Sequence, residues 1–370
     1  MRTGMIQLPL HDGKAPRWLV ERMKNLSYLI TKAIVLEHGH GTLLERLSDP
    51  LWFQAFGCVL GYDWHSSGVT TVVIGVLKHA LAEHAYDLGV MVAGGKGRNA
   101  LKASNEIVEI CDAFGISSSK TNELLYASRM AAKVDNTLLQ DGHELYHHSF
   151  IIAEDGRWAV VQQGMDVNAR TARRYHWLNA KGFVDEPRSG IIGSSILANV
   201  LDMTAKESEE CRRVCVDIAN DSNTVSSVQL LYKQSTLDTW LANNNNNATT
   251  YRDVEVYAMP KHIDWSIFKR IYDVHPRNYE ELIAVRGVGA GTVRALALIA
   301  ELIYGARASW RDPVRFTFAH GGKDGVPYPV DRRTYDESIR VLKEAIEGLD
   351  VDDRMRKDML VRLARSSILA

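Results

Sequence analysis

The sequence of 370 residues contains little cysteine, almost no net charge and no long apolar run. Apolar stretches such as residues 69–77 fall well short of the ~20 residues that span a bilayer. The N-terminus lacks the apolar core of a secretory signal, so we expect a cytoplasmic protein that does not associate with a membrane. Of the four cysteines only Cys211 and Cys215 lie close together, and their spacing fits neither a redox C-x-x-C motif nor a zinc knuckle.

The balance of 44 basic and 45 acidic residues gives a net charge of −1, which argues against a protein that coats DNA as histones do. A local basic face remains compatible with this balance, because binding depends on where the charges lie. Hydrophobic residues make up 46% of the chain, as in ordinary globular proteins. We therefore expect a folded chain with more than one domain.

Helical periodicity dominates the sequence and predicts a mostly α fold. We expect a helical N-terminal domain at 1–240 with a small β-hairpin or sheet near 145–164. Asp155-Gly156 supplies the turn of that hairpin. Residues 241–252 contain five consecutive asparagines and predict an exposed linker or loop. A helical helix-hairpin-helix domain is expected at 253–370.

The most specific motif covers residues 281–296 and resembles the helix-hairpin-helix module of DNA repair proteins. A short helix is expected to end at Val285, and a second helix is expected to begin at Thr292. Glycines between them let the backbone approach a phosphate closely, and the second helix offers unpaired amides at its positive end. Val288 is expected to fill the space between the helices. The predicted DNA-binding residues here are Arg286, Gly287, Val288, Gly289, Gly291, Thr292 and Arg294. The alternative is a helical hairpin with a glycine-rich turn and no ligand.

A polar loop follows at residues 317–333, in which Lys323 and Arg332 are predicted to contact DNA. Asp331 has two interpretations. It caps the next helix, or it is the catalytic aspartate of a glycosylase, because Val330-Asp331 is similar to the Val-Asp of helix-hairpin-helix DNA glycosylases. The segment before Asp331 is longer than in those enzymes, and Thr292 stands where bifunctional members carry lysine, so a lyase step is not expected.

Polar residues around the predicted hairpin form a second candidate site. Asp141, His143, His148 and Asp155 are predicted catalytic residues and ligands of a divalent metal, Mg or Mn. Nucleases place such side chains on adjoining strands, where metal ions hold a water and the scissile phosphate. The Asp…Glu-x-Lys signature of many nucleases is absent, and Asp155 is equally explained as a turn residue.

A basic and aromatic segment follows at residues 170–177, where a helix is expected over 169–178. Arg173 and Arg174 are predicted to pair with phosphates while Trp177 stacks on unpaired bases. The alternative is an amphipathic helix whose aromatic side belongs to the core. Gly94-Gly95-Lys96-Gly97-Arg98 is a candidate anion-binding nest. It lacks the Walker pattern, so no nucleotide cofactor is expected.

Several segments together resemble a known family. They are Thr3-Gly4, Leu8-Pro9-Leu10-His11, Trp18-Leu19, Gln162-Gln163-Gly164-Met165 and Ala319-His320-Gly321-Gly322-Lys323-Asp324-Gly325. The chain is similar to archaeal and bacterial proteins labelled a domain of unknown function, family 763, with a C-terminal helix-hairpin-helix. The resemblance implies DNA handling and carries no mechanism.

The leading hypothesis is a divalent-metal-dependent nuclease that acts on single-stranded or branched DNA in repair. Its partner is DNA, held through the backbone without sequence preference; protein partners are not predicted. One alternative is a glycosylase that uses Asp331. The other is a DNA-binding adaptor without catalysis.

Overall fold

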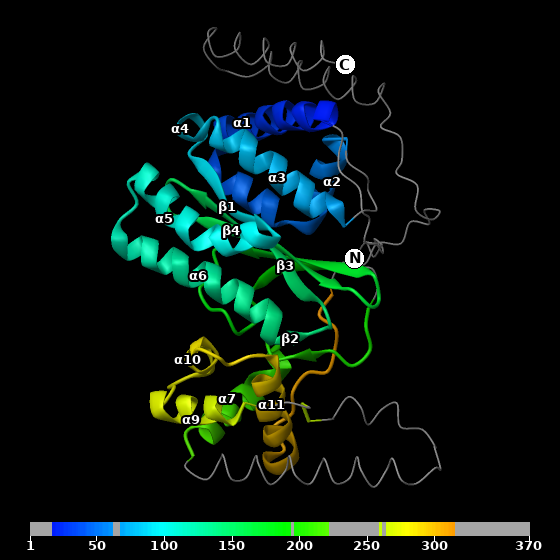
Figure 1. The fold of residues 1–370 in the computed structure, drawn as a ribbon, viewed down its shortest axis with the longest axis vertical. Helices are drawn as coiled ribbons and strands as arrows, with labels where there is room; N and C mark the ends of the chain where they lie inside the picture. Colours follow the sequence, from blue (N-terminus) through cyan, green and yellow to red (C-terminus); the bar gives the residue numbers. More distant parts are fainter. Residues whose placement is uncertain (1–16, 62–66, 194–195, 222–258, 261–263, 315–370) are drawn as a thin grey trace.

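A computed structural model describes residues 17–61, 67–193, 196–221, 259–260 and 264–314 (Figure 1). The asparagine run at 243–247 and three predicted site residues lie outside the described residues. Those three are Lys323, Asp331 and Arg332. Within the described ranges the chain is mostly helical with a small antiparallel sheet, which confirms the predicted fold class.

The five-stranded sheet separates two helical layers and has the order β1-β3-β4-β5-β6, with all neighbours antiparallel. Its strands are β1 (Val90–Lys96), β3 (Glu144–Ala153), β4 (Trp158–Asp166), β5 (Thr171–Leu178) and β6 (Arg188–Gly193). A second, two-stranded sheet pairs β2 (Leu139–Gln140) with β7 (Leu201–Asp202). The predicted hairpin is confirmed as β3 and β4, and Gly156 takes a φ of 78° in its turn.

The helix predicted over 169–178 is wrong, because residues 171–178 form strand β5. Its successive side chains point to opposite faces of the sheet, as in any strand. Both faces of β5 are covered, so Arg173, Arg174 and Trp177 are all buried. A strand buried on both sides has no polar and apolar alternation, and this removed the sequence signal that would have identified it.

One layer of helices covers the first face of the sheet (Figure 1). It contains α1 (Arg17–Ser48), α2 (Pro50–Val59), α3 (Gly68–Ala82) and α4 (Ala85–Leu88). Asp49 caps α2 by accepting hydrogen bonds from the backbone amides of Leu51 and Trp52. Val92, Ile151 and Val161 of the sheet pack into the core of this layer. Because successive side chains of a strand point to opposite faces, every second residue from these positions also faces this layer.

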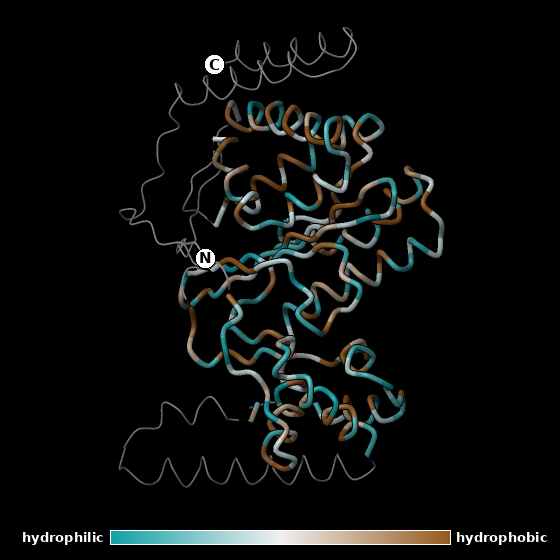
Figure 2. Tube along the Cα trace, turned by 180° about the vertical axis from the view of Figure 1, so that it is seen from behind, coloured by the Kyte–Doolittle hydropathy of each residue, from teal (hydrophilic) through white to brown (hydrophobic). Residues whose placement is uncertain are grey.

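The second face packs against η1 (Gly97–Lys102), α5 (Ala103–Phe114) and α6 (Ser118–Thr137). Figure 2 shows hydrophobic segments in both helical layers and in the strands between them. The sheet is therefore the central layer of this part of the molecule.

The remaining described helices are η2 (Lys206–Ser208), α7 (Glu209–Ala219), α9 (Trp265–Val274), α10 (Tyr279–Ala284) and α11 (Ala290–Tyr304). The Cys211 thiol lies 3.9 Å from the carbonyl oxygen of Ala297, and both residues belong to one core cluster. Thus α7, which precedes the predicted linker, packs with helices that follow it. Among the described residues no helix is long and apolar enough to cross a membrane.

Candidate functional site

The loop between α10 and α11, residues 285–289, is the first candidate site. Asn278 caps α10 by accepting a hydrogen bond from the amide of Glu281. Gly287 then takes a φ of 99°, which disfavours any residue with a Cβ. A Cβ at this position would also lie 3.0 Å from Nη1 of Arg270. The loop therefore requires glycine here.

Val288 is buried between the helices, as the sequence predicts, and its amide donates to the carbonyl of Val285. Helix α11 begins directly afterwards, with Gly289 as its N-cap and no capping side chain. The first amides of a helix have no acceptor within it and lie at the positive end of its dipole. An anion placed against residues 289–292 would meet these donors.

Basic side chains surround this loop. Arg286 is exposed, and Nη1 of Arg270 donates to its carbonyl at 2.7 Å. Lys133 of α6 donates to the carbonyl of Val285 at 3.0 Å. Burial, together with the charge of Arg129, lowers the pKa of Lys133. Arg270 and Lys133 were missed by sequence reasoning because only tertiary packing brings them here.

Two residues of the predicted DNA-binding set point inward instead. Thr292 is buried, and Arg294 is half-buried with its guanidinium 5.3 Å from the Trp310 ring. Arg294 also donates to the side chain of Gln140 at 3.3 Å, and burial lowers its pKa. The exposed part of the predicted site is therefore Arg286 and Gly287, with Gly289 and Gly291 half-buried beside them.

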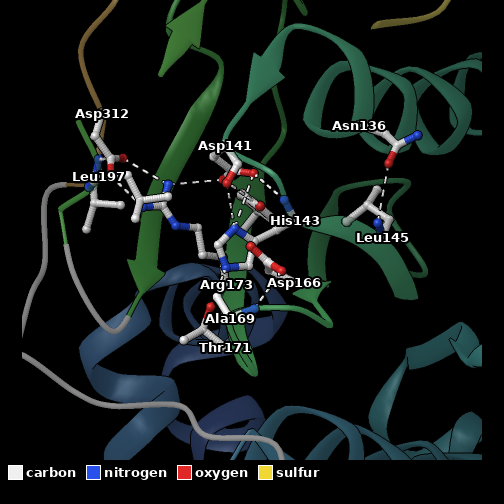
Figure 3. A network of polar contacts seen from close by, with 12 residues as sticks. Asn136, Asp141, His143, Leu145, Asp166, Ala169, Thr171, Arg173, Leu197 and Asp312 are labelled. Carbon is white, nitrogen blue, oxygen red and sulfur yellow. Dashed lines mark hydrogen bonds and ion pairs between the residues drawn. The ribbon is translucent and has the colours of Figure 1, made fainter. Parts of the chain in front are cut away.

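The second candidate is a buried network at one end of the sheet (Figure 3). Arg173 donates to Oδ2 of Asp141 at 3.0 Å and to Oδ1 of Asp312 at 2.9 Å. Tyr175 donates its hydroxyl to the same Oδ2 of Asp141 at 2.9 Å. Burial opposes the charge on Asp141, but hydrogen bonds from His143 and the charge of Arg173 hold its pKa below the ordinary value. The guanidinium of Arg173 thus neutralises the buried carboxylates of Asp141 and Asp312, and it holds Asp312 against the sheet.

The four predicted metal ligands do not form one site. Asp141 and His143 lie together, and the amide of His143 donates to Oδ1 of Asp141 at 2.9 Å. His148 is instead bonded to Ser128 at 2.8 Å and to Gln162 at 2.7 Å. Asp155 lies beyond the far end of β3, about 33 Å along a ten-residue strand from its start.

Asp155 accepts hydrogen bonds from Arg157 in the β3–β4 turn, which is the role of a turn residue. In the described part of the chain no group of three or more His, Cys, Asp or Glu side chains is placed to hold a metal ion. Of the four predicted ligands, the described residues bring only Asp141 and His143 together, and metal binding stays a prediction.

Arg173, Arg174 and Trp177 are also not placed to bind single-stranded DNA. Trp177 donates its indole N–H to Asp135 at 2.9 Å, and Arg174 donates to Gln54 at 2.9 Å. Their side chains are fully or almost fully buried between the sheet and its helical layers. A segment that stacks bases has to be exposed, so this part of the predicted DNA-binding set is incorrect.

Comparison with known proteins gives one match. A family model described as "Protein of unknown function (DUF763)" matches residues 4–330. No curated protein and no solved structure matches the chain.

Proposed function

The chain belongs to this DUF763 family, and from its geometry we propose that it binds the DNA backbone through the α10–α11 loop. The observation that carries the proposal is the exposed Arg286 and Gly287, which lead directly into the N-terminus of α11, where Gly289 provides no side-chain cap. Arg270, whose guanidinium contacts the same loop, adds a second positive charge. This combination of glycine, helix N-terminus and arginine suits a phosphate diester.

Binding of this kind has two consequences. Contacts to phosphate carry no sequence information, so affinity is expected to be similar for DNA of different sequence. Each neutralised phosphate releases counterions, so affinity is expected to fall with salt. Because the net charge of the whole chain is near zero, we expect such binding to depend on local charges like those at the loop.

We also propose that the protein binds DNA in the cytoplasm. Cleavage of DNA by a nuclease or glycosylase reaction stays a prediction. No disulfide joins the four cysteines in the described part of the chain, which suits a reducing compartment. A nuclease would need metal ligands other than the four-residue set, of which only Asp141 and His143 lie together. Asp331, on which a glycosylase would depend, lies outside the described residues.

The experiment is a fluorescence anisotropy titration of labelled single-stranded and duplex DNA. Arg286→Gln is expected to weaken binding to both DNAs and to reduce the slope of log K against log salt by about one, the value for one lost phosphate contact. Arg213→Gln is the matched control, because Arg213 is an exposed arginine on α7 with 73% of its side chain accessible. Equal affinities and slopes for the wild type and both variants would contradict the proposal.

A further inference from the structure

A row of four side chains crosses the sheet on the face that packs against α1–α3. Lys96 pairs with His147, His147 with Gln163, and Gln163 with Arg174 in three consecutive strand pairs. Direct cross-strand partners lie on the same face, about 5 Å from one another. We name this set the Lys96–Arg174 row. Gln163 fixes its orientation, because its side-chain amide donates to the carbonyl of Ser67, just before α3, at 3.0 Å.

His147 is the unusual member of the row. It is 1% exposed, and neither of its ring nitrogens has a hydrogen-bond partner. Leaving a buried polar group unpaired costs about 1–3 kcal/mol, and such groups are rare in folded proteins. Its neighbour His148, on the opposite face, has both ring nitrogens bonded. The open donor and acceptor of His147 therefore point to a ligand.

The charges of the row have no counter-charge among the described residues. Arg174 is fully buried, and its guanidinium donates to neutral groups of Pro50, Gln54, Thr70 and His176. Burial lowers the pKa of Arg174 to about 9. No carboxylate within the described ranges forms an ion pair with Arg174 or with Lys96. Buried charges are ordinarily paired, so the row is suited to an anion.

Positive groups lie at both ends of the row. Helix α3, which has 15 residues, begins at Gly68 beside Gln163, so the positive end of its dipole lies near this end of the row. At the other end of the row Lys96 is exposed and is followed by exposed Gly97 and Arg98. An anion would reach His147 from this exposed end. The glycine-rich segment that the sequence indicates as an anion nest adjoins this end of the row, and within it the Gly94 amide already donates to the carboxylate of Glu106.

We propose that the Lys96–Arg174 row binds a phosphate group, contacted by Lys96 and His147 and attracted by the charge of Arg174. This site is separate from the α10–α11 loop and does not depend on DNA binding there. The phosphate group is either inorganic phosphate or the terminal phosphate of a nucleic acid strand. Both sources present the same tetrahedral oxyanion.

The first experiment is calorimetric titration of the full chain with inorganic phosphate at constant ionic strength. His147→Leu and Lys96→Gln are each expected to weaken binding at least ~tenfold, as expected for a lost hydrogen bond to a charged group. His147→Leu removes two unsatisfied nitrogens at similar volume, so we expect it to fold. Lys96→Gln changes an exposed side chain and provides a second variant that does not depend on that expectation. Lys206→Gln, another exposed lysine, is the control and should bind phosphate as the wild type does.

The second arm identifies the source. Two oligonucleotides that differ only in a 5′-phosphate or a 5′-hydroxyl are titrated into the wild type and into Lys96→Gln. Tighter binding of the phosphorylated strand, lost in Lys96→Gln, assigns the site to strand ends. Binding of inorganic phosphate alone assigns it to the free ion. If neither probe binds at the row, or if both variants bind as tightly as the wild type, the proposal is overturned.

Discussion

Adjacent arginines of strand β5 lie on opposite faces of the sheet and have opposite surroundings. Arg173 is held by two carboxylates, those of Asp141 and Asp312. Arg174 has only neutral partners, although it is equally buried. A buried charge paired with opposite charges inside the chain has a structural explanation, whereas a buried charge without a counter-charge in the described chain can attract a charged ligand. The same contrast separates His148 from His147, and it distinguishes the structural face from the face that we propose to bind phosphate.

The largest expected effect comes from replacing Arg173 with methionine. Arg173→Met leaves two buried carboxylates without their shared cation, and removing one partner of a buried pair costs about 3–5 kcal/mol. Arg174→Met removes hydrogen bonds to neutral groups and is expected to cost less than half as much. Urea unfolding of both variants measures the difference. Equal losses of stability would show that the two faces do not differ as described.

The pH dependence of stability gives the next effect. Burial lowers the pKa of His147 to about 3, that of His148 below its usual value, and that of His176 well below it. The unfolded chain therefore takes up protons first as the pH falls, and the folded state loses stability below the ordinary histidine pKa of about 6.5. Each histidine contributes up to about 1.4 kcal/mol per pH unit.

We expect the free energy of unfolding to decrease between pH 6.5 and pH 5, a range that lies above the titration of most carboxyl groups. His147→Leu should make this slope shallower by one histidine's contribution. A free energy of unfolding that stays constant from pH 8 to pH 5 would contradict the prediction.

The smallest of these stability effects compares the two neighbouring histidines at neutral pH. His148→Leu strands the buried polar atoms of Ser128 and Gln162 and should destabilise the fold by about 1–3 kcal/mol. His147→Leu strands no partner and should leave stability unchanged or increase it. Thermal unfolding in buffer without phosphate measures both. A loss for His147→Leu as large as that for His148→Leu would mean that the ring has a structural role.

Local features of the fold were predictable from the sequence, and those that depend on packing were not. The β3–β4 hairpin could be identified from Asp155-Gly156, because a tight turn depends on adjacent residues alone. The glycines of the α10–α11 loop were found for the same reason, since Gly287 needs its positive φ whatever surrounds it. Strand β5 was misassigned because burial on both faces hides the period of a strand.

The four predicted metal ligands are not all brought together, for a related reason. Asp141, His148 and Asp155 are close in sequence, but an extended strand separates its ends and turns successive side chains to opposite faces. The Lys96–Arg174 row shows the converse, because its members come from four strands and only the register aligns them. No spacing in the sequence specifies that register.

The most direct test of DNA binding by the α10–α11 loop uses two substitutions of Gly289, the N-cap of α11. Aspartate and asparagine are both good caps, and a Cβ at this position meets only the carbonyl oxygen of Gly287, at 3.9 Å, so both variants should fold. Gly289→Asp also places a negative charge where a phosphate would lie. We predict that Gly289→Asp binds labelled DNA at least ~tenfold more weakly than Gly289→Asn, a difference of about 1.4 kcal/mol. Equal affinity of these two variants would contradict the proposed DNA-binding function.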